Sequence, residues 1–378
     1  MKKTFTFLLS AAILIGILPI SALADEHELS AQSAIVLCAD TGDVLFEKNA
    51  DEHMLIASIT KIMTAIVAIE NYDLDEEIVI KPEWSAIEGS SMYANPYESY
   101  TVRELLTGMM LASGNDAAAA LACSLCGDEL SFAVKMNEKA AELGMENSSF
   151  RNPHGLDDPE HYSTARDMAR LTAYCMENDD FKSIVSSSSA TIKDVTYYNH
   201  NRLLREYDGC IGVKTGYTIA AGRTLVSCAE RDGMRLICVT LNAPDDWNDH
   251  KYLLDEAFKN YRMLSYCGDS FKVSLPVASA IKTVADAVPK NDIRMLIKSD
   301  DEVNVSIEAP RILFAGGIAG QIVGQMKVLI NGELAAQEDL VYTEDVVQSP
   351  DQKLSTHERF MRMFETMLGP YYAIGEER

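Results

Sequence analysis

The chain has 378 residues, of which 57 are acidic and 33 are basic, so its net charge at pH 7 is -24. This length suggests two domains. The strong negative charge argues against a nucleic-acid partner, because nucleic-acid-binding surfaces are basic.

Residues 1–24 have the pattern of a secretory signal peptide. Lys2 and Lys3 precede an apolar run, and Ala22-Leu-Ala24 forms a small-residue cleavage site before Asp25. We therefore expect an exported protein that acts on the outer face of the cytoplasmic membrane, in the cell wall or in the periplasm. No later stretch is long and apolar enough to predict a membrane-spanning helix.

The segment that follows predicts strands first and helices next. Two short apolar runs, Ser33–Leu37 and Val44–Phe46, are joined by turn residues and predict an antiparallel pair. Helical patterns then occupy Met54–Ile69, Thr101–Leu111, Asp116–Cys126 and Thr164–Glu177. Thr101 and Glu104 form a capping box at the start of the second of these helices.

Strand patterns return at Gly212–Gly216, Arg223–Glu230 and Met234–Leu241. Because tight turns join antiparallel strands, the arrangement predicts an α+β fold in which an antiparallel sheet is covered by helices. Residues Asp249–Leu264 predict a closing helix. We place all these elements in one domain, residues 25–268.

Residues 269–348 predict a smaller C-terminal all-β domain, with strand-like runs and turn signals such as Asn331-Gly332. Residues 349–378 predict a linker and a short terminal amphipathic helix. One face of this helix carries four large apolar residues, Phe360, Met363, Phe364 and Met367. The stripe is compatible with peripheral contact with a membrane or with docking on the protein's own surface.

Eight cysteines are scattered along the chain, and Cys38, Cys228 and Cys238 lie in apolar strand-like runs. Since cysteine packs as a small hydrophobic residue, we expect mostly free, buried thiols. Cys123 and Cys126 form a C-x-x-C pair, but no second cysteine pair or histidine pair accompanies it. We therefore predict no metal site and no cofactor.

Ser58 and Lys61 form the first of three motifs. Every residue from Met54 to Ile69 is apolar, Ala, Ser or Thr, except Lys61. A helix that is apolar nearly all round is buried, and an unpaired buried ammonium is costly. Lys61 must therefore be paired or have a lowered pKa. The same spacing recurs at Ser279 and Lys282, but there it falls in a strand-like segment.

The pair suits nucleophilic catalysis, because a serine hydroxyl needs a base to take its proton. Positions i and i+3 of a helix share one face. A lysine is a base only when neutral, and lowering its pKa from about 10.4 to near 7 requires roughly 4–5 kcal/mol. Burial and a second cation shift the pKa in this direction, and Lys214 is the candidate for that cation.

The other two motifs are Ser113-Gly-Asn115 and Lys214-Thr-Gly216. Taken alone, the first is an ordinary turn with a helix N-cap and the second is a plain edge strand. In this order after Ser58 and Lys61, they match the elements of the serine acyl-transferases that bind penicillin. A glycine at position 216 would let a ligand backbone approach the strand closely.

The sequence resembles the low-molecular-mass penicillin-binding proteins that are D-alanyl-D-alanine carboxypeptidases, serine peptidases of the bacterial cell wall. Further segments carry the resemblance: Asn152–Asp157, Tyr162–Met168, Gly212–Thr218 and Ala221-Gly222. The resemblance implies a β-lactamase/transpeptidase-like catalytic domain that removes the terminal D-alanine from peptidoglycan stem pentapeptides. It also implies that β-lactam antibiotics are covalent inhibitors.

By position, the resemblance implies two groups of site residues. The catalytic group is Ser58, Lys61, Ser113 and Asn115, and the substrate-binding group is Lys214, Thr215, Gly216 and Tyr217. Ser58 would form the acyl-enzyme, with Lys61 as its general base. The backbone N–H groups of Ser58 and Tyr217 would form the oxyanion hole. Family members often carry an arginine that helps hold the carboxylate, and Asp245–Lys251 contains none.

Three alternatives remain open from the sequence. A D,D-endopeptidase would use the same residues on peptidoglycan cross-links. A β-lactamase of class A needs a Glu-x-x-Leu-Asn element, which the chain lacks. A penicillin-binding sensor without turnover needs a transmitter that crosses the membrane, and no such segment is predicted.

Overall fold

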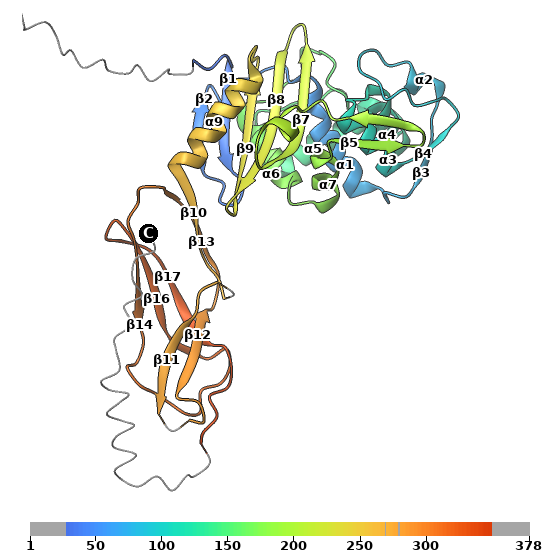
Figure 1. Cartoon of the computed structure of the whole chain (residues 1–378). Helices are drawn as coiled ribbons and strands as arrows, with labels where there is room; N and C mark the ends of the chain where they lie inside the picture. The colour runs from blue at the N-terminus through green and yellow to red at the C-terminus, as the bar shows by residue number, and fades with distance from the viewer. Residues whose placement is uncertain (1–27, 269, 279, 350–378) are drawn as a thin grey trace, which may run out of the picture.

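The computed structural model describes residues 28–268, 270–278 and 280–349. They form two bodies of unequal size, joined by a two-stranded ribbon (Figure 1). All the helices of the described residues lie in the larger body. The predicted signal peptide and the predicted C-terminal amphipathic helix lie outside the described residues.

A five-stranded sheet forms the centre of the larger body. Its strands, in order across the sheet, are β2 (Val44–Lys48), β1 (Ser33–Cys38), β9 (Met234–Leu241), β8 (Gly222–Arg231) and β7 (Cys210–Thr218). Every neighbouring pair is antiparallel, so the predicted fold class is confirmed. Strand β7 lies at one edge, with a neighbour on one side only.

Helices cover both faces of this sheet. The helical elements are η1 (Ala57–Thr60), α1 (Lys61–Asn71), α2 (Pro82–Ser85), α3 (Val102–Leu111), α4 (Asn115–Cys126), α5 (Glu129–Glu142), α6 (Ala165–Cys175), α7 (Asp179–Ser186), α8 (Leu203–Glu206) and α9 (Asp246–Asn260). Because successive strand residues point to opposite faces, Val239 packs with the large helical group and Cys238 packs with Leu254 of α9.

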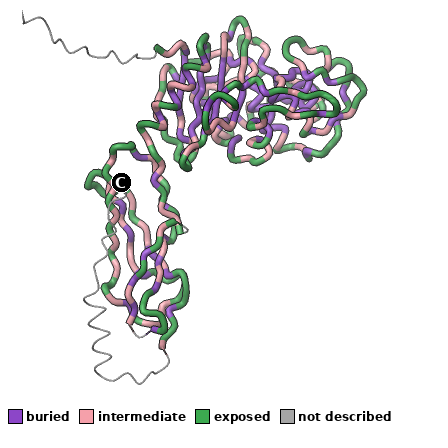
Figure 2. Tube along the Cα trace, viewed as in Figure 1, coloured by how far each residue is buried: buried purple, intermediate pink, exposed green. Residues whose placement is uncertain are grey.

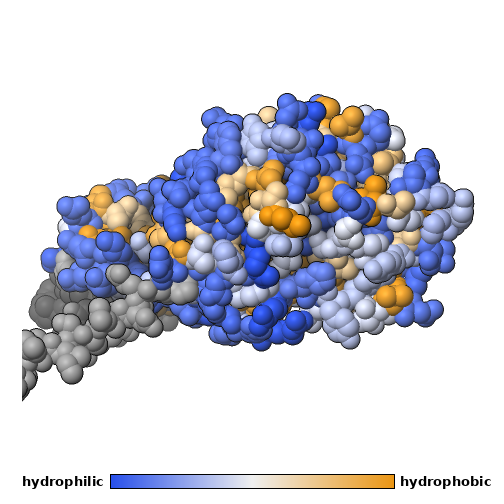
Figure 3. Space-filling view, turned by 90° about the horizontal axis from the view of Figure 1, so that it is seen from above, coloured by the Kyte–Doolittle hydropathy of each residue, from blue (hydrophilic) through white to orange (hydrophobic). Residues whose placement is uncertain are grey.

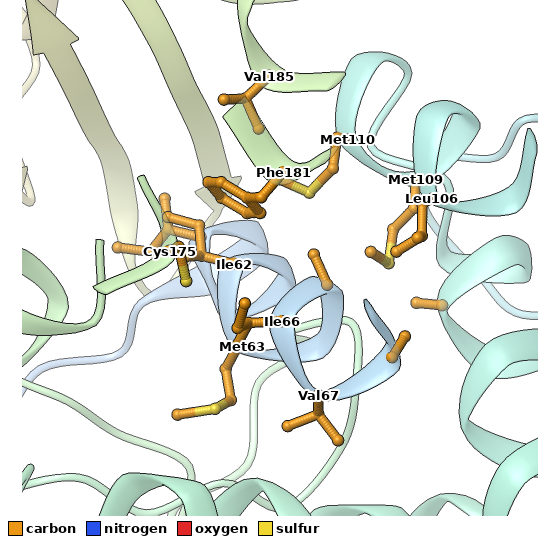
Figure 4. Close-up of a cluster of buried hydrophobic side chains, with 14 of the residues drawn as sticks. Ile62, Met63, Ile66, Val67, Leu106, Met109, Met110, Cys175, Phe181 and Val185 are labelled. Carbon is orange, nitrogen blue, oxygen red and sulfur yellow. The ribbon is translucent and has the colours of Figure 1, made fainter. Parts of the chain in front are cut away.

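Helix α1 lies in the middle of the core (Figure 4). Its Ile62 and Ile66 belong to the same buried cluster as Met109 of α3 and Phe181 of α7. All residues from Lys61 to Ala68 are buried, which confirms the prediction of a helix apolar on all sides. Buried residues are correspondingly dense in the larger body (Figure 2), while its face in Figure 3 is mainly hydrophilic, with small scattered hydrophobic groups.

Three sequence predictions are corrected. Ser58 lies in the 3-10 turn η1 and not in the same α-helix as Lys61, where α1 begins. The predicted closing helix, Asp249–Leu264, is α9, which ends at Asn260, and residues 261–264 form a strand. The pairing of this segment with a second strand overrides its helical pattern. Helix α5, which Asp128 caps through the backbone N–H of Ser131, is absent from the sequence prediction.

The smaller body is built from β-strands, as predicted. Its six-stranded sheet has the order β14 (Val303–Glu308), β16 (Ile322–Ile330), β17 (Glu333–Tyr342), β12 (Val284–Pro289), β11 (Val273–Ala278) and β15 (Leu313–Phe314). Asn331 and Gly332 both have positive φ and form the predicted turn between β16 and β17.

Three two-stranded units complete the described chain. They are β3 (Glu77–Val79) with β4 (Ser99–Thr101), β5 (Ser189–Ile192) with β6 (Val195–Tyr198), and β10 (Tyr261–Tyr266) with β13 (Ile293–Lys298). The last pair is the ribbon between the two bodies in Figure 1.

All eight cysteines lie in described residues and are free thiols, as expected, but only four of them are buried and the other four are partly exposed. Within the described ranges, no group of three or more His, Cys, Asp or Glu side chains is placed to hold a metal ion. No single helix of the described chain is long and apolar enough to cross a membrane; α4 and α5 meet that criterion only as a pair bent by 86°.

A loop that we call the strap, residues 152–155, fixes the start of α1. Thr64 of α1 donates to the carbonyl oxygen of Pro153 at 2.6 Å. Asn152 Oδ1 accepts from the backbone N–H of Gly155 at 2.7 Å. Gly155 has a φ of 86°, and a Cβ at this position would lie 1.9 Å from the carbonyl oxygen of Ala57. Only glycine allows this close approach.

Replacing Gly155 with alanine tests this packing. We expect Gly155→Ala to lower the free energy of unfolding by about 2–5 kcal/mol, because backbone strain and overpacking add. Gly42→Ala is the matched control, since Gly42 has a φ of 80° and a Cβ added there would meet no heavy atom within 4 Å; strain alone costs about 1–2 kcal/mol there. Urea unfolding followed by circular dichroism measures both. Equal losses would contradict a tightly packed strap.

Candidate active site

The amine of Lys61 lies among three oxygen atoms. Lys61 Nζ lies 3.0 Å from Ser58 Oγ, 2.7 Å from Asn115 Oδ1 and 2.7 Å from the carbonyl oxygen of His154. Ser58 and Lys61 meet because residues i and i+3 eclipse each other in a 3-10 turn. The three partners come from η1, α4 and the strap, which are far apart in the sequence.

The chemistry of these partners gives the amine an orientation. The oxygens of Asn115 and His154 accept hydrogen bonds only. A neutral amine has two N–H bonds and one lone pair, so these two oxygens use both hydrogens. The lone pair then faces Ser58, whose hydroxyl is able to donate to it.

Burial favours this neutral state of Lys61. The side chain is completely buried, and this burial lowers its pKa well below 10.5, with the positive charge of Lys214 acting in the same direction. The charge of Asp116 opposes the shift. The sequence predicts a lowered pKa for Lys61 with Lys214 as the second cation, and the burial of Lys61 and the charge of Lys214 both act in that direction.

Ser113 and Asn115 lie in the junction between α3 and α4. Ser113 has a φ of 60°, a left-handed conformation that non-glycine residues seldom adopt, and its Oγ lies 3.1 Å from Lys214 Nζ. Asn115 Nδ2 donates to the carbonyl oxygen of Glu88 at 2.6 Å. This bond fixes the amide so that Oδ1 faces Lys61.

Asp116 is a site-forming residue that sequence reasoning missed. Its carboxylate accepts hydrogen bonds from Ser91 Oγ and from the backbone N–H groups of Met92 and Ala94, at 2.7, 3.0 and 3.0 Å. These bonds hold the loop whose Ser90 lines the cavity beside Ser58. The available signal was a charged residue in an otherwise alanine-rich helix, the same signal that identified Lys61.

Strand β7 brings the third motif against η1. Lys214 is buried and donates to Ser113 Oγ, which links the second and third motifs. A Cβ on Gly216 would lie 2.9 Å from the backbone nitrogen of Ser58, so glycine is required for this contact. Tyr217 is 65% exposed, which places its side chain at the rim and not in the floor.

A cavity of about 540 Å³ lies above these groups. It is lined by Ser58, Ser90, Ser113, His200, Arg202, Thr215, Gly216, Tyr217, Arg223, Asp246 and Trp247. Lys61, Asn115 and Lys214 do not line it; they are buried behind Ser58 and Ser113. All eight predicted site residues therefore gather at one place, five on the cavity wall and three behind it.

Comparison with known proteins agrees with this geometry. A family model described as D-alanyl-D-alanine carboxypeptidase matches residues 20–245. The D-alanyl-D-alanine carboxypeptidase DacF of Bacillus subtilis is 32% identical over 372 residues, covering 92% of this chain and 95% of the relative. The Escherichia coli D-alanyl-D-alanine carboxypeptidase DacC is 32% identical, covering 85% of this chain and 86% of the relative.

Solved structures are similar over the same extent. The crystal structure of the D-alanyl-D-alanine carboxypeptidase DacD from Francisella tularensis matches with a TM-score of 0.64 and 30% identity, covering 85% of this chain and 95% of that one. Penicillin binding protein 5 from Haemophilus influenzae matches with a TM-score of 0.65 and 28% identity, covering 85% and 98% of the two chains.

Lys214 makes a testable contribution to stability. Burial lowers the pKa of Lys214 from 10.5 to about 7. At pH values between these two, the unfolded chain binds more protons than the folded chain. The stability of the wild type therefore rises with pH across this window. Lys214→Met removes the cost of burial. We expect the variant to be about 1–4 kcal/mol more stable than wild type at pH 7, with the difference shrinking as the pH rises.

Urea unfolding at neutral and alkaline pH measures this difference. Lys290→Met is the control, because Lys290 is exposed and its replacement should leave stability unchanged within about 0.5 kcal/mol. A Lys214→Met variant that is less stable than wild type at pH 7, or whose advantage does not change with pH, would contradict the lowered pKa.

Proposed function

The chain belongs to the D-alanyl-D-alanine carboxypeptidase family of serine peptidases, and we propose that Ser58 is the nucleophile of its reaction. The reaction is hydrolysis of the bond before the terminal D-alanine of a peptidoglycan stem peptide. One observation carries the assignment: Lys61 Nζ lies 3.0 Å from Ser58 Oγ and 2.7 Å from each of two oxygens that only accept hydrogen bonds.

In the acylation step, the lone pair of Lys61 takes the hydroxyl proton of Ser58 while Oγ attacks the carbonyl carbon of the penultimate D-alanine. The negative charge that forms on the carbonyl oxygen is stabilised by the backbone N–H groups of Ser58 and Tyr217. The close approach of Gly216 to the Ser58 nitrogen supports this pairing, because it brings β7 next to η1.

The proton then returns to the leaving group. Ser113 Oγ passes a proton from Lys61 to the nitrogen of the terminal D-alanine, the C–N bond breaks, and D-alanine leaves as the free amino acid. Asn115 keeps the Lys61 amine in place throughout. A water molecule, deprotonated by Lys61, next attacks the ester of Ser58 and regenerates the hydroxyl.

We propose that Thr215, on the cavity wall, binds the terminal carboxylate directly and that Lys214, buried behind the wall, attracts it by its charge. Lys214 has a pKa of about 7 in the absence of an anion. A bound carboxylate favours the protonated form, so substrate binding charges Lys214 and thereby lowers the pKa of Lys61 further. β-Lactam antibiotics bind in the same pocket and acylate Ser58.

The comparisons favour the carboxypeptidase over the alternatives left open by the sequence, namely an endopeptidase, a β-lactamase and a sensor without turnover. We further propose that residues 1–24 are removed on export and that residues 25–268 work outside the cytoplasmic membrane. Residues 269–348 would then hold the catalytic domain at a distance from residues 349–378.

Exposed apolar side chains at one end of the smaller body support peripheral membrane contact through the C-terminal helix. Ile281, Phe314 and Ile318 are 63%, 72% and 63% exposed. Backbone hydrogen bonds tie the segments that carry them to Val346 and Val347, just before the described chain ends at residue 349. Apolar residues are thus gathered where the linker to the predicted helix begins.

Peptide hydrolysis tests the nucleophile. On a diacetyl-Lys-D-Ala-D-Ala peptide, Ser58→Ala should lower the rate of D-alanine release by about 10⁴-fold or more, and mass spectrometry after penicillin treatment should find the adduct on Ser58 in wild type only. Lys282→Met, which changes the lysine of the second Ser-x-x-Lys sequence, should leave both readouts unchanged. Equal D-alanine release by wild type and Ser58→Ala would overturn the proposal.

Vesicle sedimentation tests the membrane contact. The chain from residue 25 to 378 should sediment with vesicles of phosphatidylethanolamine and phosphatidylglycerol, and deletion of residues 349–378 should weaken partitioning by about 10-fold or more. Phe314→Ser should weaken it less. Leu334→Ser is the control: Leu334 is 58% exposed but follows the turn at the opposite end of β17. Undiminished partitioning of the deletion variant would exclude the contact.

A further inference from the structure

The cavity wall carries two arginines that the sequence analysis did not assign. Arg202 and Arg223 both line the cavity, and their guanidinium carbons lie 5.7 and 5.5 Å from the ring centre of Trp247. The segment Asp245–Lys251, where an arginine was sought, contributes Asp246 and Trp247 to the wall instead. A guanidinium is therefore present, but it comes from other elements.

Arg223 reaches the cavity from the strand next to the Lys-Thr-Gly strand. In the antiparallel register, Arg223 pairs with Tyr217 and Leu225 pairs with Thr215. Residues two apart on a strand, and their direct partners across it, share one face. The side chains of Thr215, Tyr217 and Arg223 consequently lie on the same face of the sheet edge.

Asp246 holds the guanidinium in one orientation. Arg223 Nε donates to Asp246 Oδ1 at 2.9 Å, and Nη2 lies 2.9 Å from the same oxygen. The Asp246 side chain is only 2% exposed, whereas that of Arg223 is 40% exposed. The buried carboxylate therefore binds one edge of the guanidinium. The Nη1 end remains for a ligand in the cavity.

Arg202 lacks this support. It pairs with Glu206, whose side chain is 34% exposed, and is itself 55% exposed. It precedes the four-residue helix α8 rather than lying in the central sheet. Ion pairs between exposed groups fix a side chain weakly, so Arg202 is the less preorganised of the two.

We propose that Arg223 binds the terminal carboxylate of the substrate together with Thr215, and that Asp246 and Trp247 are positioning residues for it. The inference rests on the proposed function, because it assigns a specificity residue for that reaction. Arginine suits this role because its planar fork donates two parallel hydrogen bonds to a carboxylate. The enzyme would accordingly select peptides that end in a free carboxylate.

The test compares ligands with and without this negative charge. The substrates are diacetyl-Lys-D-Ala-D-Ala and the same peptide with a C-terminal amide. Arg223→Gln should lower kcat/KM on the acid by roughly 10- to 100-fold, mainly through KM, and on the amide by less than about 3-fold. Arg205→Gln, which changes an exposed arginine that does not line the cavity, is the control and should change neither value by more than about 3-fold. Arg202→Gln tests the other guanidinium beside the same tryptophan.

A second pair of ligands separates this inference from the proposed function. Benzylpenicillin carries a carboxylate and its methyl ester does not, and acylation of Ser58 by each is measured by mass spectrometry. Arg223→Gln should slow acylation by the acid selectively, with Arg223→Lys intermediate. Wild type that releases D-alanine from neither peptide would contradict the proposed function, while the antibiotic pair would still decide the role of Arg223.

Two results would overturn the assignment. Equal losses on the acid and on its neutral analogue would make Arg223 a structural residue only, and acid-selective losses in Arg202→Gln would transfer the role to Arg202. Thermal unfolding of each variant provides the check on folding. If Arg223→Gln fails to fold, Arg223→Lys is tested instead, because lysine keeps the positive charge but lacks the planar guanidinium. The deciding quantity is again the loss on the acidic ligand divided by the loss on its neutral analogue.

Discussion

The active site depends on one completely buried amine. Lys61 contacts Ser58, Asn115 and the strap carbonyl of His154. An ammonium in this position would need a carboxylate partner, and the nearby Asp116 is engaged with the backbone of the loop that follows Ser91. Burial favours the neutral amine, and in that state its three contacts determine which way its lone pair points.

Packed side chains surround α1 (Figure 4), and their burial offsets the free-energy cost of placing a lysine in the core. Two other stresses lie at the same place: Ala57 and Ser113 have φ values of 49° and 60°, in a region that is unfavourable for residues with a Cβ. Such strain persists only where the surroundings over-determine the backbone, and it clusters at functional sites. The strap at Gly155 and the carboxylate of Asp116 provide that constraint.

The floor and the wall of the cavity carry different chemical groups. The floor, formed by Ser58 and Ser113 with two buried lysines behind them, has the chemistry for making and breaking an acyl bond. The wall contains residues of β7, β8 and α9, among them Thr215, Arg223 and Trp247, and we propose that it recognises an anionic chain end. This division explains why Gly216 matters to both: it is the point at which β7 touches the backbone of Ser58.

The sequence by itself determined the secondary-structure class, the buried character of α1 and the set of residues that gather at the cavity, because apolar periodicity, turn residues and three short motifs are local properties of the chain. It did not reveal Asp116 as the anchor of the site loop, nor Arg223 as part of the cavity wall. Those roles arise from long-range contacts: the register of β7 with β8, and a carboxylate that reaches a loop more than twenty positions earlier. Only the tertiary structure decided which charges face one another, because beyond a turn or two the separation of residues along a chain does not fix their distance in space.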